Sequence, residues 1–149
     1  MLRAVLDTNI VVSGTISSSG APYDVLQAWR QRRFTLVTSP DILLEIQRVF
    51  DYPKIRKSYD LEPKTIKAII ARLNKYSVVT AGKVKVSAID DDPTDNMFLA
   101  CAKEAEADFI VTGDSHLLDL KSFEGIPIVS PRYFLNTLDE RAKNQQEEH

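Results

Sequence analysis

The sequence predicts an α/β fold with a mainly parallel sheet, because short apolar runs alternate along the chain with longer amphipathic segments. The length of 149 residues fits one domain, and 44% hydrophobic with 27% charged residues supplies a substantial core. No apolar run is long enough to span a membrane, and a single Cys excludes an internal disulfide framework. We therefore expect a cytoplasmic protein with one folded domain over residues 1–138 and a charged tail over 139–149.

The first third of the chain contains two predicted strands. An apolar strand covers residues 2–6, and a Ser-rich loop at 17–20 precedes a helix that Pro22 opens. The second strand covers Thr35–Thr38. Residues that favour the start of a helix follow this strand directly, so we expect the order strand, helix, strand, helix.

The helix over residues 40–50 begins at Ser39, which is a good N-cap residue, and has Pro40 at its first position. Its apolar side chains share one broad face. Glu45 falls about 100° from the centre of that face at 3.6 residues per turn. We expect its carboxylate to lie along the edge of the sheet rather than in the core.

The rest of the chain continues the alternation. A polar helical segment over 52–76 is broken before Pro63, and an interrupted strand follows over 77–86. The remaining elements are a helix at 94–105, a strand at 109–112, a short helix at 116–120, a strand at 126–129 and a helix from Pro131. Residues 145–149 are expected to fray.

Asp7 and Asp114 each stand where a predicted strand ends. Ligands bind at this edge of a parallel sheet, because the loops leave a crevice where the strand order reverses. Glu45 and Asp95 lie in helices that begin at the same edge, so we expect all four carboxylates to converge. At about 4 Å, and with an effective dielectric near 20, each unpaired pair repels by roughly 4 kcal/mol, so the cluster requires a cation or protons.

Oxygen ligands alone favour a hard divalent cation, Mg²⁺ or Mn²⁺. Such an ion activates water and stabilises charge in phosphodiester hydrolysis. Each acid also has a structural explanation: Asp7 as a turn former, Glu45 on a solvated face, Asp95 beside a helix dipole and Asp114 as a cap. The joint pattern favours the metal site.

Four segments follow one another in order along the chain. They are DTNI at 7–10, DILLEI at 41–46, DPTDNMFLA at 92–100, and IVTGD at 110–114 followed by two leucines. Together they resemble the PIN-domain family of metal-dependent ribonucleases, which includes the toxins of many toxin-antitoxin pairs. The resemblance implies a three-layer α/β/α sandwich on a mainly parallel sheet of about five strands.

The same resemblance implies functional roles for eight residues. The catalytic metal ligands are Asp7, Glu45, Asp95 and Asp114, and the supporting residues are Thr8, Asn9, Asp92 and Thr112. It also implies an endoribonuclease that uses Mg²⁺ or Mn²⁺ to cut single-stranded RNA. A cognate antitoxin and a homodimer are the partners that it suggests.

The segment from Lys54 to Lys75 is locally basic, with seven basic residues against two acidic ones, a balance of +5. We predict that its first basic residues, Lys54, Arg56 and Lys57, attract RNA phosphates toward the acidic site. Interleaved tyrosines offer rings on which bases could stack. The alternative is a solvated helical face with its aromatic side chains in the core.

Two other functions remain open. A haloacid-dehalogenase-like phosphatase also has an Asp at the end of its first strand, but Asn9 stands where that chemistry needs a second acid. A non-catalytic RNA-binding or partner-binding module would keep the acids for structure alone. Cleavage inside an oligoribonucleotide distinguishes the nuclease from both, since a phosphatase clears phosphomonoesters and a binding module cuts nothing.

Overall fold

Strand β1 (Arg3–Leu6) lies at the centre of the sheet in this computed structural model, which describes residues 1–86 and 93–147. Within these residues the sheet has six strands in the order β3-β2-β1-β4-β6-β5. The other five are β2 (Thr35–Thr38), β3 (Val78–Val79), β4 (Phe109–Val111), β5 (Ser122–Phe123) and β6 (Ile126–Val129). All neighbours pair in parallel except β5 and β6.

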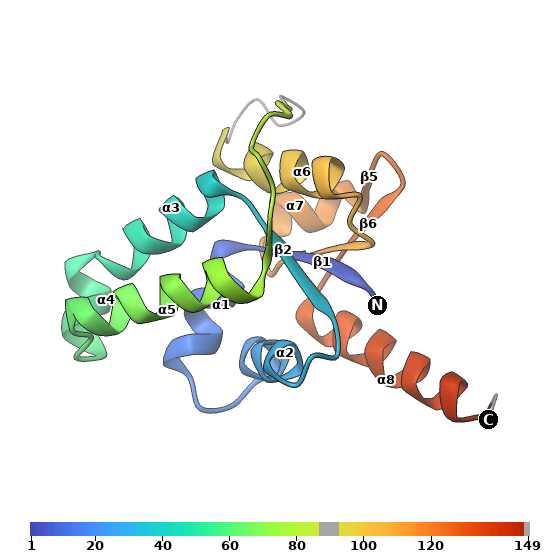
Figure 1. The fold of residues 1–149 in the computed structure, drawn as a ribbon, viewed down its shortest axis with the longest axis horizontal. Coiled ribbons are helices and arrows are strands. Elements are labelled where there is room, and N and C mark those ends of the chain that lie inside the picture. The colour runs from blue at the N-terminus through green and yellow to red at the C-terminus, as the bar shows by residue number, and fades with distance from the viewer. Residues whose placement is uncertain (87–92, 148–149) are drawn as a thin grey trace.

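Helices cover both faces of this sheet (Figure 1). They are α1 (Thr8–Ile16), α2 (Ala21–Arg30), α3 (Pro40–Phe50), α4 (Pro53–Ser58), α5 (Pro63–Tyr76), α6 (Pro93–Ala105), α7 (Ser115–Leu120) and α8 (Pro131–Glu147). Helices α6 and α7 lie on one side of the strands, and α2 and α8 lie on the other. Helices α3 and α5 pack together and extend away from the sheet, with α4 at their outer end.

The predicted fold class is confirmed: the protein is an α/β protein with a mainly parallel sheet between helical layers. Three local features account for the accuracy of the prediction around α3. Ser39 Oγ accepts a hydrogen bond from Ile42 N at 3.2 Å, and Pro40 occupies the first helical position. Ile42 and Ile46 then fall on one buried face. Helix α3 therefore begins and ends where the sequence predicts.

Helix α1 was not predicted, because its sequence is rich in β-branched residues and has apolar side chains all round. It forms because it is buried, with Asp7 as its N-cap and α2 packed against it. Gly14 makes that packing possible. A Cβ there would lie 2.6 Å from Pro22 O and 2.7 Å from Leu26 Cδ1, which is closer than side chains approach.

Three further differences concern strands and the C-terminus. The prediction of a strand over residues 77–86 is wrong beyond Val79, where β3 ends. The chain leaves the sheet there and crosses toward α6. Strand β5 was missed, since two residues show no periodicity; it pairs with β6 through a tight turn in which Glu124 and Gly125 both have positive φ. Residues 145–147, expected to fray, belong to α8.

The core fills the space between the sheet and both helical layers. Its largest side chains include four phenylalanines that are at most 2% exposed: Phe34, Phe50, Phe98 and Phe134. No helix among the described residues is long and apolar enough to cross a bilayer.

Candidate active site

Asp7 and Asp114 lie at the carboxyl ends of β1 and β4, which are neighbours at the centre of the sheet. From β1 the chain continues outward to β2 and β3 on one side, and then crosses back to β4 on the other. The strand order therefore reverses between these two acids, at the edge where parallel sheets bind ligands. The position predicted for the two carboxylates is confirmed.

The hydroxyl of Thr112 connects the two acids. It donates to Asp7 Oδ2 at 2.6 Å and accepts from Asp114 N at 3.0 Å. The side chain of Thr112 is fully buried, so the contact is shielded from water. Thr112 thereby sets the position of the Asp7 carboxylate and of the backbone at Asp114.

Both acids also cap helices, which is the structural explanation given for Asp114, whereas Asp7 was expected to be a turn former. Asp7 Oδ1 accepts from Asn9 N at 3.2 Å at the start of α1, and Asp114 Oδ1 accepts from His116 N at 2.8 Å at the start of α7. Capping uses one oxygen of each carboxylate. It fixes the orientation of both groups without excluding a ligand role.

Burial raises the pKa of Asp7 above its usual value, and the nearby charge of Asp114 adds to the rise. Hydrogen bonds from the Thr112 hydroxyl and from Asn9 N oppose it. Asp7 is only 4% exposed. An ionised Asp7 is therefore costly here unless a positive charge lies beside it.

Asp95 lies at the same edge of the sheet. At the other end of α6, the guanidinium of Arg3 donates to Ala105 O at 2.9 Å, which places the C-terminus of α6 at the start of β1. The first turn of α6, which contains Asp95, therefore lies toward the carboxyl ends of the strands. Asp95 is buried there, and α6 packs against β1, β2 and β4.

Glu45 has a different immediate partner. Its carboxylate forms an ion pair with Arg48, one turn further along α3, at 2.6 Å, and its side chain is 17% exposed. Arg48 was overlooked in the sequence, although the spacing of three residues in a helix is the pattern by which it could have been found. The helix itself contacts α1 and α6, so Glu45 is on an element that borders the other acids.

The structure does not bring all four predicted carboxylates together. Among the described residues, no three His, Cys, Asp or Glu side chains are close enough together to hold a metal ion. Like charges separate unless a cation lies between them, and Glu45 is neutralised by Arg48 instead. The structure brings Asp7, Thr112 and Asp114 together, and the complete ligand set stays a prediction.

Three predicted supporting residues remain, namely Thr8, Asn9 and Asp92. Thr8 is buried beside Asp7, and its hydroxyl has no hydrogen-bond partner among the described residues, whereas the exposed Asn9 contributes its backbone N–H. Asp92 lies outside the described residues. Hard divalent cations prefer oxygen ligands, so the buried carboxylate of Asp7 and the buried, unsatisfied hydroxyl of Thr8 fit such an ion in their chemistry.

The predicted RNA-binding residues are on α4, at the outer end of the α3–α5 extension. Lys54 and Lys57 are exposed, and Arg56 is half-buried. The tyrosines on either side of α4, Tyr52 and Tyr59, are 46% and 49% exposed. Their rings are therefore accessible, contrary to the alternative in which they belong to the core.

A sequence profile of the PIN domain matches residues 3–116, more than half of the chain. The chain belongs to the PIN-domain family. PIN domains are nucleases, and the family match places this chain among hydrolases. An uncharacterized protein of Methanocaldococcus jannaschii is 32% identical over 120 residues, covering 80% of this chain and 76% of that protein.

Solved structures show the same fold at low sequence identity. The crystal structure of VapBC2 from Rickettsia felis, bound to a DNA fragment from its promoter, contains a chain that matches with a TM-score of 0.56 and 15% identity. The match covers 87% of this chain and 98% of that chain. A chain of FitAcB from Neisseria gonorrhoeae matches with a TM-score of 0.49 and 16% identity, covering 86% and 97%. The first of these likenesses supports the fold.

Proposed function

We propose that this PIN domain is a Mg²⁺- or Mn²⁺-dependent endoribonuclease that hydrolyses phosphodiester bonds in single-stranded RNA. The observation that supports it most is the pair Asp7 and Asp114, joined by the Thr112 hydroxyl where the strand order reverses. Asp7, Glu45, Asp95 and Asp114 are the proposed catalytic metal ligands. The family match favours this function over the phosphatase.

The electrostatics of Asp7 explain why a cation belongs beside it. Burial and the charge of Asp114 both raise the pKa of this carboxyl, and a divalent cation bound by both groups would offset both effects. Such an ion supplies an activated water and stabilises the charge on the phosphate. The protein's own residues would hold the ion: the Asp7 and Asp114 carboxylates would bind the cation, and the Thr112 hydroxyl orients the Asp7 carboxylate.

Glu45 can join this set at little energetic cost. Its partner Arg48 has a side chain that is 62% exposed, and surface ion pairs of this kind contribute about 0–1 kcal/mol. The attraction between two carboxylates and a divalent cation is far stronger than such a surface ion pair, because the site is shielded from water. We therefore infer that Glu45 exchanges Arg48 for the metal.

We further propose that the nuclease acts in the cytoplasm as the toxin of a toxin-antitoxin pair, as a homodimer, with a cognate antitoxin as its partner. The resemblance of the four sequence segments to PIN-domain toxins supports this role. The solved VapBC2 structure is consistent with it in fold. The exposed basic residues of α4, together with Tyr52 and Tyr59, are the proposed contact surface for RNA.

Incubation with end-labelled single-stranded RNA and Mn²⁺ tests the nuclease directly. We expect wild type to produce internal fragments, and we expect Asp95→Asn purified in the same way to produce none. EDTA should stop the reaction, and a phosphomonoester should remain uncleaved. Fragments from both proteins would indicate a contaminating nuclease, and RNA binding without cleavage at any metal concentration would support the binding module instead.

Thr112→Val tests the orienting role of the hydroxyl. Removing it leaves Asp7 Oδ2 without its donor and Asp114 N without its acceptor, in a side chain of nearly the same shape. We expect about 10- to 100-fold weaker Mn²⁺ binding by titration calorimetry, the range for groups that orient metal ligands. Thr112→Ser keeps the hydroxyl and should retain most of the affinity; equal affinity in the Val and Ser variants would argue against the role.

A further inference from the structure

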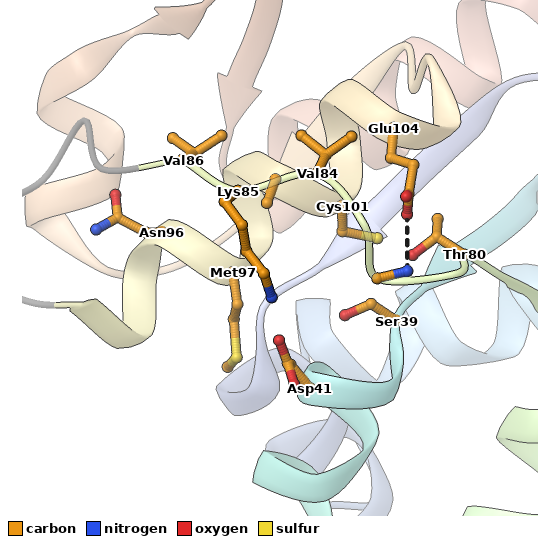
Figure 2. Close-up of a pocket in the computed structure, with 12 residues that line it drawn as sticks. Ser39, Asp41, Thr80, Val84, Lys85, Val86, Asn96, Met97, Cys101 and Glu104 are labelled. Atoms are coloured by element: carbon orange, nitrogen blue, oxygen red, sulfur yellow. Dashed lines mark hydrogen bonds between the residues drawn. The ribbon is translucent and has the colours of Figure 1, made fainter.

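A cavity lies between the start of α3, residues 80–86 and one face of α6 (Figure 2). We name residues 80–86 the strap. The cavity has a volume of about 150 Å³. Ser39 and Asp41, which line it, follow β2 at the carboxyl edge of the sheet, and Asn96 and Met97 come directly after Asp95. The cavity is therefore at the same edge of the sheet as the proposed metal ligands but is built from other residues.

Glu104 holds the strap against α6. Its carboxylate accepts hydrogen bonds from Gly82 N at 3.1 Å and Lys83 N at 2.9 Å. The Thr80 hydroxyl and these N–H groups lower the pKa of Glu104, so it stays ionised and keeps these bonds near neutral pH. Gly82 has a φ of +76°, a conformation that glycine adopts at little cost. The wall of the cavity is thus formed before any ligand binds.

The remaining walls combine apolar surface with two opposite charges. Val84 and Met97 provide apolar atoms, and burial raises the pKa of the Cys101 thiol to about 12, so that it is neutral and unreactive. The Lys85 side chain extends from the strap across the cavity toward Asp41 on α3 (Figure 2). Lys85 offers only hydrogen-bond donors, whereas the Asp41 carboxylate offers only acceptors.

The size of the cavity limits what it can hold. A pocket for a drug-sized ligand has a volume of about 300–1,000 Å³, and water occupies about 30 Å³ per molecule. A volume of about 150 Å³ is therefore half the lower limit for such a ligand. It suits one flat ring system, with apolar atoms against its faces and polar groups at its edge.

We propose that this cavity holds the nucleobase next to the phosphodiester that is cut, and that it prefers a base with both an amino group and a ring carbonyl. Guanine and cytosine have both groups, adenine lacks the carbonyl and uracil lacks the amino group. Lys85 donates to the carbonyl oxygen, and Asp41 accepts from the amino group, which are pairings that side chains commonly use to distinguish bases. This inference rests on the proposed ribonuclease function, which supplies the RNA.

Binding of single nucleotides tests the cavity without requiring cleavage. Methyl NMR spectra of Met97 and Val84 are recorded in EDTA during titration with GMP, CMP, AMP and UMP. We expect GMP and CMP to shift these methyl signals at concentrations about tenfold lower than AMP and UMP. Equal shifts with all four nucleotides, or no shift with any of them, would overturn the proposal.

Mapping the cut sites in a randomised RNA pool tests the same residues during catalysis. Lys85→Met and Asp41→Asn should reduce the preference for guanine or cytosine beside the cut by about tenfold. The dependence on Mn²⁺ concentration should not change. Lys83→Met is the matched control, because its exposed side chain lies on the strap but does not line the cavity.

The outcomes separate this inference from the proposed function. If wild type cuts RNA and neither variant alters the base preference, the cavity does not select the base, and the nuclease stands. If Asp41→Asn lowers only the melting temperature, Asp41 acts solely on the dipole of α3, and the proposal fails. If wild type cuts no RNA, the ribonuclease function fails, and the nucleotide titration decides whether the cavity binds a base.

Discussion

Replacing Asp7 with Asn is expected to abolish RNA cleavage while making the metal-free protein more stable. Asn keeps one oxygen, which can accept from Asn9 N, and its amide nitrogen replaces Oδ2 and can donate to the Thr112 hydroxyl oxygen. Asn is also as good an N-cap as Asp. The negative charge is lost, however, and with it a proposed metal ligand. We expect activity to fall by more than about 100-fold, since even groups that only orient ligands can contribute that much.

The gain in stability follows from the raised pKa of Asp7. A carboxyl whose pKa is higher in the folded protein than in the unfolded chain stabilises the fold below its unfolded pKa of 3.8, and this contribution is lost as the pH rises through the folded value. At neutral pH the ionised Asp7 therefore weakens the metal-free fold. Asp7→Asn removes this cost.

Thermal unfolding in EDTA at several pH values checks this prediction. Each gain of about 1 kcal/mol raises Tm by about 2–4 °C in a chain of this length. We expect Asp7→Asn to melt above wild type at pH 7, and the difference to shrink as the pH approaches 3.8. Asp7→Ala, which loses the cap and both hydrogen bonds, is the control and should melt below the Asn variant. Full cleavage activity in Asp7→Asn would refute the ligand role.

Replacing Phe134 with Ala is expected to be the most destabilising change in the core. Phe134 is fully buried on α8, and its ring lies edge-on against Phe34 at 4.9 Å and Phe109 at 5.7 Å between ring centres. These contacts join α8 to the residue before β2 and to the first residue of β4. The ring therefore holds one helical layer to the sheet.

Truncating a buried Phe to Ala costs about 3–5 kcal/mol, which corresponds to a fall in Tm of about 6–20 °C here. Differential scanning calorimetry of the metal-free protein measures it. Tyr133→Ala, at the neighbouring position of the same helix, is the matched control because its side chain is 58% exposed, and it should change stability by less than about 0.5 kcal/mol. Similar losses in both variants would refute the role of the buried ring, since Ala is a better helix former than either aromatic residue.

Helix boundaries were predictable where local chemistry sets them. Ser39 and Pro40 start α3, and Pro63 starts α5 after a break, because caps and prolines act within one turn of the chain. Helix α1 was not predictable in this way. Its β-branched residues disfavour a helix, and burial against α2, made possible by Gly14, outweighs this preference.

In the candidate site, too, some features could be predicted from the sequence and others were not. That Asp7 and Asp114 meet could be inferred, because each follows a strand of a parallel sheet, and the Thr112 hydroxyl between them lies two residues before Asp114. The ion pair of Glu45 with Arg48 was overlooked, although the helical spacing indicates it. The full set of metal ligands stays a prediction.

The sequence by itself determined the alternation of strands and helices, the family and the edge at which the acids gather. These features depend on periodicity and on motifs of a few residues, which the chain specifies locally. The tertiary structure alone decided the helical state of α1, the course of the strap and the cavity between α3, the strap and α6. Glu104 and Gly82 are 22 residues apart, and their contact exists only because α6 and the strap pack together. Side-chain chemistry at such distances along the chain is set by packing.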